Sequence, residues 1–189
     1  MHDDFRLMLY LGASADTITL SDYLALDADA RLANRVDLSM VTISIMAGGR
    51  EHLAPRLSLG PLHRITPQLG VARERLVRGE PALIRSGVMD VEDGNYLLLE
   101  PDGVTGPIRA SVVSTDDIEV SHVFPDEFRA QDLYAYVASQ RTNLLNRTRR
   151  VGSFPVELPL EREALLAALD REAALGLTVL SQADEPDGA

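Results

Sequence analysis

The sequence lacks cysteine and lysine, two residue types on which much protein chemistry depends. Without cysteine there is no disulfide framework, thiolate zinc site, iron–sulfur cluster or thiol nucleophile. All 18 basic residues are arginines, which also excludes a phosphate-loop lysine, a Schiff-base lysine and a Ser-Lys dyad. Composition alone therefore excludes several large classes of enzyme.

Long apolar runs are absent as well. A membrane span needs about 18 consecutive apolar residues, whereas the N-terminal apolar segment, Phe5 to Leu11, has seven residues and contains Arg6. No basic region precedes it, as a secretory signal would require. We therefore expect a cytoplasmic protein without a membrane segment. Hydrophobic residues at 46% and charged residues at 25% are typical of a globular domain.

The net charge of −11 is unevenly distributed. Residues 50–85 carry seven arginines and three glutamates, whereas residues 86–140 carry two arginines and eleven acids. Residues 141–150 add four arginines and no acid. Because an acidic surface repels polyanions, a nucleic-acid role would depend on the two basic stretches. The opposed charges of 50–85 and 86–140 favour pairing within the chain or between subunits.

The N-terminal part is expected to be mainly helical. Ser21 is a suitable N-cap for a helix that reaches about Val36. Ser39 could cap a second short helix, Met40 to Ala47, although the β-branched residues of this segment fit a buried strand equally well. The segment Phe5 to Leu11 is too short for its pattern to distinguish a strand from a helix.

The next stretch has the order of a winged helix-turn-helix. Thr66-Pro67 places an N-cap hydroxyl before a proline at the first helical position, and Gly79 would end that helix. Residues 80–87 fit one further helical turn, and Asp93-Gly94 predicts a β-hairpin. The strands of this hairpin would be Val88 to Val91 and Tyr96 to Leu99. The apolar positions of the first helix would be Leu69, Val71, Leu76 and Val77.

The C-terminal half is expected to form a small α/β unit. A strand at Ile108 to Val113 would precede a long helix from Pro125 to about Arg147. A βαβ-like arrangement would follow. Its parts would be a strand at Val156 to Leu158, a helix at Glu161 to Leu175 ended by Gly176, and a strand at Leu177 to Leu180. The predicted class is thus α+β, with a winged-helix-like domain over 1–103, an α/β subdomain over 104–182 and a disordered acidic tail over 183–189.

Three segments of the chain carry a resemblance to a known family. They read Leu69-Gly-Val-Ala-Arg-Glu-Arg-Leu, Pro81-Ala-Leu-Ile-Arg-Ser-Gly-Val and Tyr96-Leu-Leu-Leu. They resemble the winged-helix region that precedes the ATPase module of some bacterial AAA+ ATPases, over about residues 20–100. Leu177 to Glu185 looks like the hydrophobic strand and Asp-Glu pair of a Walker B motif. With no glycine-rich phosphate loop and no lysine, the resemblance implies a non-catalytic relative.

The candidate binding residues are arginines in or beside the predicted helix 66–79, namely Arg64, Arg73, Arg75, Arg78 and Arg85. On a recognition helix they could contact guanines or phosphates in a major groove. The predicted hairpin, however, carries Asp90, Glu92 and Asp93, whose carboxylates would repel the DNA backbone. The arginines could equally form a solvated helix face or pair with acids, so protein binding ranks above DNA binding.

No catalytic, cofactor or metal site is expected. The four histidines (His2, His52, His63 and His122) are scattered, whereas metal sites gather several ligands. Asp116, Asp117 and Asp126 could supply carboxylates for acid–base work, but acids in loops and first helical turns are common without catalysis. The expected function is a non-enzymatic winged-helix module that binds a protein partner or itself. The alternatives are a DNA-binding regulator using residues 66–79 and a carboxylate-dependent enzyme.

Overall fold

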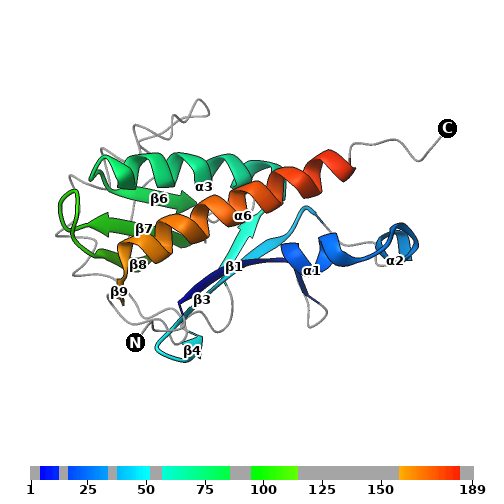
Figure 1. The fold of residues 1–189 in the computed structure, drawn as a ribbon, viewed down its shortest axis with the longest axis horizontal. Helices are drawn as coiled ribbons and strands as arrows, with labels where there is room; N and C mark the ends of the chain where they lie inside the picture. Colours follow the sequence, from blue (N-terminus) through cyan, green and yellow to red (C-terminus); the bar gives the residue numbers. More distant parts are fainter. Residues whose placement is uncertain are drawn as a thin grey trace.

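The computed structural model, drawn in Figure 1, describes residues 5–12, 17–33, 38–51, 57–85, 95–114 and 158–183. Helices and antiparallel sheets both occur in these ranges, in agreement with the α+β class. No helix in these ranges combines the length and apolar character needed to cross a membrane.

The first sheet contains five strands in the order β2-β1-β3-β4, with β5 also paired to β3. The strands are β1 (Arg6–Leu11), β2 (Ile18–Thr19), β3 (Val41–Ala47), β4 (Arg50–Glu51) and β5 (Leu57–Gly60). The central pair, β1 and β3, is antiparallel over six positions. Burial alternates along β1, with Leu7, Leu9 and Leu11 fully buried. The helical alternative for Met40 to Ala47 is therefore wrong, and the β-branched residues of that segment form a buried strand.

The second sheet is antiparallel, in the order β6-β7-β8-β9. Its strands are β6 (Ala82–Arg85), β7 (Asn95–Pro101), β8 (Ile108–Ser114) and β9 (Leu158–Leu160). The strand predicted at Ile108 to Val113 is confirmed. The helical turn predicted within 80–87 is wrong, because residues 82–85 pair with β7. A hairpin is present, but β6 is the strand that pairs with β7; the predicted strand 88–91 lies outside the described residues.

Two long helices, α3 (Leu62–Val77) and α6 (Arg162–Ala183), lie side by side across the strands of both sheets (Figure 1). One core fills the space between them and the sheets. On α3 the buried residues recur every three or four positions, as expected for one face of a helix. They are Leu62, Ile65, Thr66, Leu69, Ala72 and Leu76. Val71 and Val77, which the sequence placed on the apolar face, are exposed instead.

Helix α3 begins one turn earlier than the sequence predicts. Its N-cap is Pro61, so Pro67 lies inside the helix and Thr66 is not a cap. The Thr66 hydroxyl instead donates to the Leu62 carbonyl, at 2.9 Å. Pro67 is exposed, as is His63 four residues before it, so the carbonyl that proline leaves without a donor lies on the solvent side of the helix. The predicted end is confirmed, since Gly79 follows the helix with a φ of +75°.

Helix α6 continues through Gly176, where the sequence predicted its end. A Cβ atom at Gly176 would lie 2.5 Å from the Thr66 hydroxyl oxygen. The glycine therefore permits a close approach of α3 and α6 and does not end the helix. Leu177 to Leu180 is helical, so the predicted βαβ unit and the Walker-B-like strand are both wrong.

The helix predicted from Ser21 is divided in two, α1 (Leu20–Ala25) and α2 (Ala28–Ala33). Thr19 is the N-cap of α1 and accepts from the Asp22 amide at 3.1 Å. The Asp27 carboxylate accepts from the Ala30 amide at 2.7 Å, which starts the second helix. A capping side chain in mid-segment thus explains the break.

The predicted domain boundary at residue 103 falls in the turn between β7 and β8. These strands pair over seven positions, and Leu99 on one side and Ile108 on the other belong to the same buried cluster. The described residues on both sides of the boundary therefore share a core. The predicted helix 125–147 and the tail beyond Ala183 lie outside the described residues.

Candidate functional site

The candidate arginine Arg73 joins the two long helices. Its Nε atom lies 2.6 Å from a carboxylate oxygen of Asp170 on α6. The two side chains are 39% and 56% exposed, so solvent screens their attraction. Because Arg73 pairs with Asp170 on α6, its guanidinium is already used in a contact within the chain.

Arg75 and Arg78 share one carboxylate, that of Glu80. Arg78 donates to its two oxygens at 3.2 and 3.3 Å, and a nitrogen of Arg75 lies 3.4 Å from one of them. The Arg75 Nε also donates to the Pro81 carbonyl at 2.7 Å. The hydrogen bond from Arg78 is the main reason that the pKa of Glu80 is below its usual value. Both arginines therefore hold the turn that connects α3 to β6.

The five candidate arginines do not form one cluster. Arg64 is exposed near the start of α3, and Arg73 lies nine residues further, half a turn around the helix axis. Arg85 belongs to β6, and the position of its side chain is outside what the structure describes. Among the described residues, Arg73 pairs with Asp170, and Arg75 and Arg78 pair with Glu80. Most of the acids of 86–140, with which pairing was expected, lie outside the described residues.

A residue that the sequence did not single out, Arg162, organises one corner of the molecule. Its side chain is only 7% exposed and donates to two carbonyls, those of Leu76 at the end of α3 and of Gly103 in the β7–β8 turn. A cation at the end of α3 suits the negative pole of that helix. One sequence signal could have indicated Arg162. It lies in the first turn of α6, where the helix dipole disfavours a cation, so an arginine there points to a contact outside that helix.

Two exposed valines directly follow the residues whose carbonyls Arg162 binds. Val104 follows Gly103 and packs over the α3 end, since a Cβ at Gly79 would lie 3.1 Å from the Val104 side chain. Val77 is the last residue of α3. They are 62% and 44% exposed. We call these two exposed valines, Val77 at the end of α3 and Val104 in the β7–β8 turn, the corner patch.

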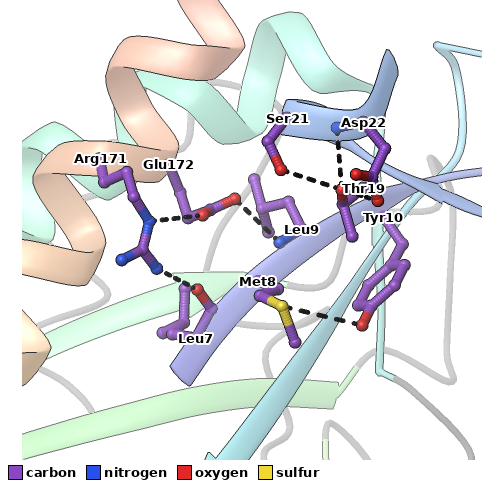
Figure 2. Close-up of polar contacts among 9 residues, drawn as sticks. All are labelled: Leu7, Met8, Leu9, Tyr10, Thr19, Ser21, Asp22, Arg171 and Glu172. Atoms are coloured by element: carbon purple, nitrogen blue, oxygen red, sulfur yellow. Dashed lines mark hydrogen bonds and ion pairs between the residues drawn. The ribbon is translucent and has the colours of Figure 1, made fainter. Parts of the chain in front are cut away.

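A second polar cluster lies where α6 meets β1, as Figure 2 shows. The Leu9 amide donates to the Glu172 carboxylate at 3.1 Å, and the Arg171 guanidinium donates to the Leu7 carbonyl at 3.0 Å. Arg171 also donates to Glu172 at 3.2 Å. We call Arg171 and Glu172, with these bonds, the β1 clamp. No sequence signal indicated it, because adjacent Arg and Glu residues are common on solvated helices.

Burial dominates the electrostatics of the β1 clamp. Glu172 is 4% exposed, and this loss of solvation raises the pKa of its carboxyl above the usual value. The Leu9 amide and the Arg171 guanidinium act in the opposite direction without cancelling the effect. An ionised Glu172 carboxylate therefore has an electrostatic cost in this position, which its hydrogen bonds offset in part.

Within the described ranges, no three His, Asp or Glu side chains come together as metal ligands would. His63 is exposed on α3. The other three histidines and the acids Asp116, Asp117 and Asp126 lie outside the described residues.

Comparisons with protein-family models, curated proteins and solved structures found no match to this chain.

Proposed function

We propose that this chain is a non-enzymatic protein-interaction module and that its binding surface centres on the corner patch. The observation that carries the proposal is the placement of Val77 and Val104. Both are large, exposed and apolar, and both belong to a corner that the buried Arg162 holds in place. Exposed apolar side chains on a preorganised surface, with an Arg78–Glu80 ion pair beside them, fit the apolar centre and polar rim of a protein interface.

Only two parts of the expected winged helix, a helix and the hairpin after it, support this proposal. A winged helix places a β-hairpin after its second helix, and here α3 leads into the hairpin of β6 and β7. The short helix expected between them is replaced by β6. The likeness therefore rests on α3 and the hairpin, and the corner patch lies at the end of that same helix.

DNA binding by α3 is the weaker alternative. A recognition helix needs arginines free to meet phosphates and bases, whereas Arg73, Arg75 and Arg78 are paired with carboxylates. Titration of a labelled DNA duplex from low to moderate salt distinguishes the two functions. We expect no binding; binding that weakens steeply with salt and is lost on Arg75→Ala would favour the DNA function.

The test of the proposal is the double variant Val77→Asp/Val104→Asp, with Val71→Asp as a matched control. Val71 is 44% exposed, as Val77 is, but lies in the middle of α3. Affinity capture from the native cell and sedimentation velocity measure partner binding and self-association. We expect the wild type and the control to bind a partner or self-associate, and the double variant to lose that binding. Equal binding by all three proteins, or none by the wild type, contradicts the proposal.

A further inference from the structure

Each valine of the corner patch has an exposed carboxylate close to it in the chain. Glu74 lies one helical turn before Val77, and residues three apart on a helix are neighbours, with Cβ atoms about 5–6 Å apart. Asp102 lies shortly before Val104 in the β7–β8 turn, which the Asp102 amide closes by donating to the Pro107 carbonyl at 2.9 Å. Both acidic residues are exposed.

A third exposed carboxylate belongs to the first turn of α6. Glu163 directly follows Arg162, whose guanidinium binds the carbonyls of the residues before the two valines. Glu163 is exposed, whereas Arg162 beside it is buried. The three carboxylates thus come from the three segments that Arg162 joins. We call Glu74, Asp102 and Glu163 the acidic rim.

The cations of this corner are already used within the chain. Arg78 pairs with Glu80 at 3.2 Å, and the buried guanidinium of Arg162 donates to two carbonyls. Within the part of the chain that the structure describes, no carboxylate of the acidic rim forms an ion pair. The charge that the described residues leave unpaired around the corner patch is therefore negative.

We propose that the partner of the corner patch is a cationic segment in which apolar residues are flanked by arginine or lysine. The inference rests on the proposed function, because it names the chemistry of the partner for the same surface. The apolar side chains of the segment cover Val77 and Val104, and its cations meet the acidic rim. Complementary charge at an interface selects the partner and speeds association more than it raises affinity. The net charge of −11 acts in the same direction at longer range.

Three synthetic peptides of equal length test the chemistry of the partner. The cationic apolar probe repeats Leu-Ala-Arg, the anionic apolar probe repeats Leu-Ala-Glu, and the cationic polar probe repeats Ser-Ala-Arg. Fluorescence anisotropy of the labelled peptides measures their binding to the full-length chain. We expect the cationic apolar probe alone to bind, and its affinity to fall as salt is added. No binding of that probe, or equal binding of either of the other two, overturns the proposal.

Charge variants of the chain show where the cationic apolar probe binds. The test variant neutralises the acidic rim: Glu74→Gln/Asp102→Asn/Glu163→Gln. The matched control removes the same charge from three exposed residues in and beside α1 and α2: Asp22→Asn/Asp27→Asn/Asp29→Asn. These lie toward the other end of α6 (Figure 1), where Arg31 of α2 donates to Gln182. Asparagine preserves the capping role of residue 27.

We expect the test variant to weaken binding of the cationic apolar probe by at least about fivefold, as the loss of three exposed charge contacts implies. The control should weaken it by less than about twofold, because its charges are remote and screened. Equal weakening by the two variants overturns the proposal, since the attraction would then come from the net charge alone. All substituted side chains are exposed, and circular dichroism checks that each variant is folded.

A valine variant separates this inference from the proposed function. Val77→Ser/Val104→Ser removes the apolar side chains of the corner patch without adding charge, and we expect it to lose binding of the cationic apolar probe. If it loses binding while the acidic-rim variant retains it, the inference is overturned and the proposed function stands. If it retains binding, the probe binds elsewhere, and both are overturned.

Discussion

Replacing Gly176 with alanine tests the closest approach of the two long helices. A Cβ at this position would lie 2.5 Å from the Thr66 hydroxyl oxygen and 3.2 Å from its methyl carbon. The hydroxyl is held by its bond to the Leu62 carbonyl, so it cannot rotate away without losing that bond. Overpacking of this kind costs about 1–3 kcal/mol, against a gain of about 1 kcal/mol for alanine over glycine inside a helix. We therefore expect a net loss of up to about 2 kcal/mol.

Two further variants isolate the steric cause. Gly70→Ala on α3 meets no atom within 4 Å, so we expect it to stabilise by about 0.5–1 kcal/mol. In a Thr66→Ala background the nearest remaining atom of residue 66 is its Cβ, at 3.4 Å, an ordinary contact. Gly176→Ala should then become neutral or stabilising, with a coupling energy above about 1 kcal/mol.

Urea unfolding followed by circular dichroism measures these differences. For a chain of this size, 1 kcal/mol corresponds to a shift in melting temperature of about 2–4 °C. The reasoning is refuted if Gly176→Ala stabilises the wild type as Gly70→Ala does. It is also refuted if the effect of Gly176→Ala is the same with threonine and with alanine at position 66.

Three other predictions concern ionic side chains. Because burial raises the pKa of Glu172 above about 4.5, its contribution to stability is present below that pH and is lost as the pH rises through the folded-state pKa. The unfolding free energy of the wild type relative to Glu172→Gln should therefore fall with rising pH, by at most about 1.4 kcal/mol per pH unit; a pH-independent difference contradicts this. Arg162→Met leaves two carbonyls without their donor and should cost about 2 kcal/mol or more in urea unfolding, a cost under about 0.5 kcal/mol being inconsistent with a buried bridge. Arg73→Ala removes an exposed ion pair with Asp170 and should cost about 0.2–1 kcal/mol, less at 1 M salt; a larger or salt-insensitive cost would contradict the exposure of the pair.

The sequence correctly predicted those elements that are specified by the residues of one short segment. The strand at Ile108 to Val113 and the end of α3 at Gly79 were predicted correctly. An alternating apolar pattern and a glycine after a periodic segment need no distant partner to be interpreted. A hairpin is present, but its first strand is Ala82–Arg85 instead of the predicted Val88 to Val91, and the predicted turn at Asp93-Gly94 lies outside the described residues. A four-residue apolar segment fits a helical turn or a strand until its partner strand is known.

The failures share a cause. Pro67 was interpreted as the start of a helix and Gly176 as the end of one. Both lie inside helices, α3 and α6, and the residues that pack against those helices determine this. Gly176 faces Thr66, 110 residues away in the sequence. Helix α3 begins early because Leu62 and Ile65 of its first turn are buried in the core. Burial of a whole helix face outweighs the preference of one residue to start or end a helix. The spacing of residues in the sequence does not show which residues will pack against that face.

The candidate sites divide in the same way. Composition excluded thiol and lysine chemistry, and the charge distribution identified residues 50–85, which include α3, as a basic stretch, because those properties depend only on which residues are present. Which acids pair with its arginines, which valines remain exposed, and how Arg171 and Glu172 meet the edge of β1 were decided only by the tertiary structure. Each of these contacts joins segments distant in the chain or depends on the direction in which a helix face points, and the packing of α3 and α6 against the two sheets determines both.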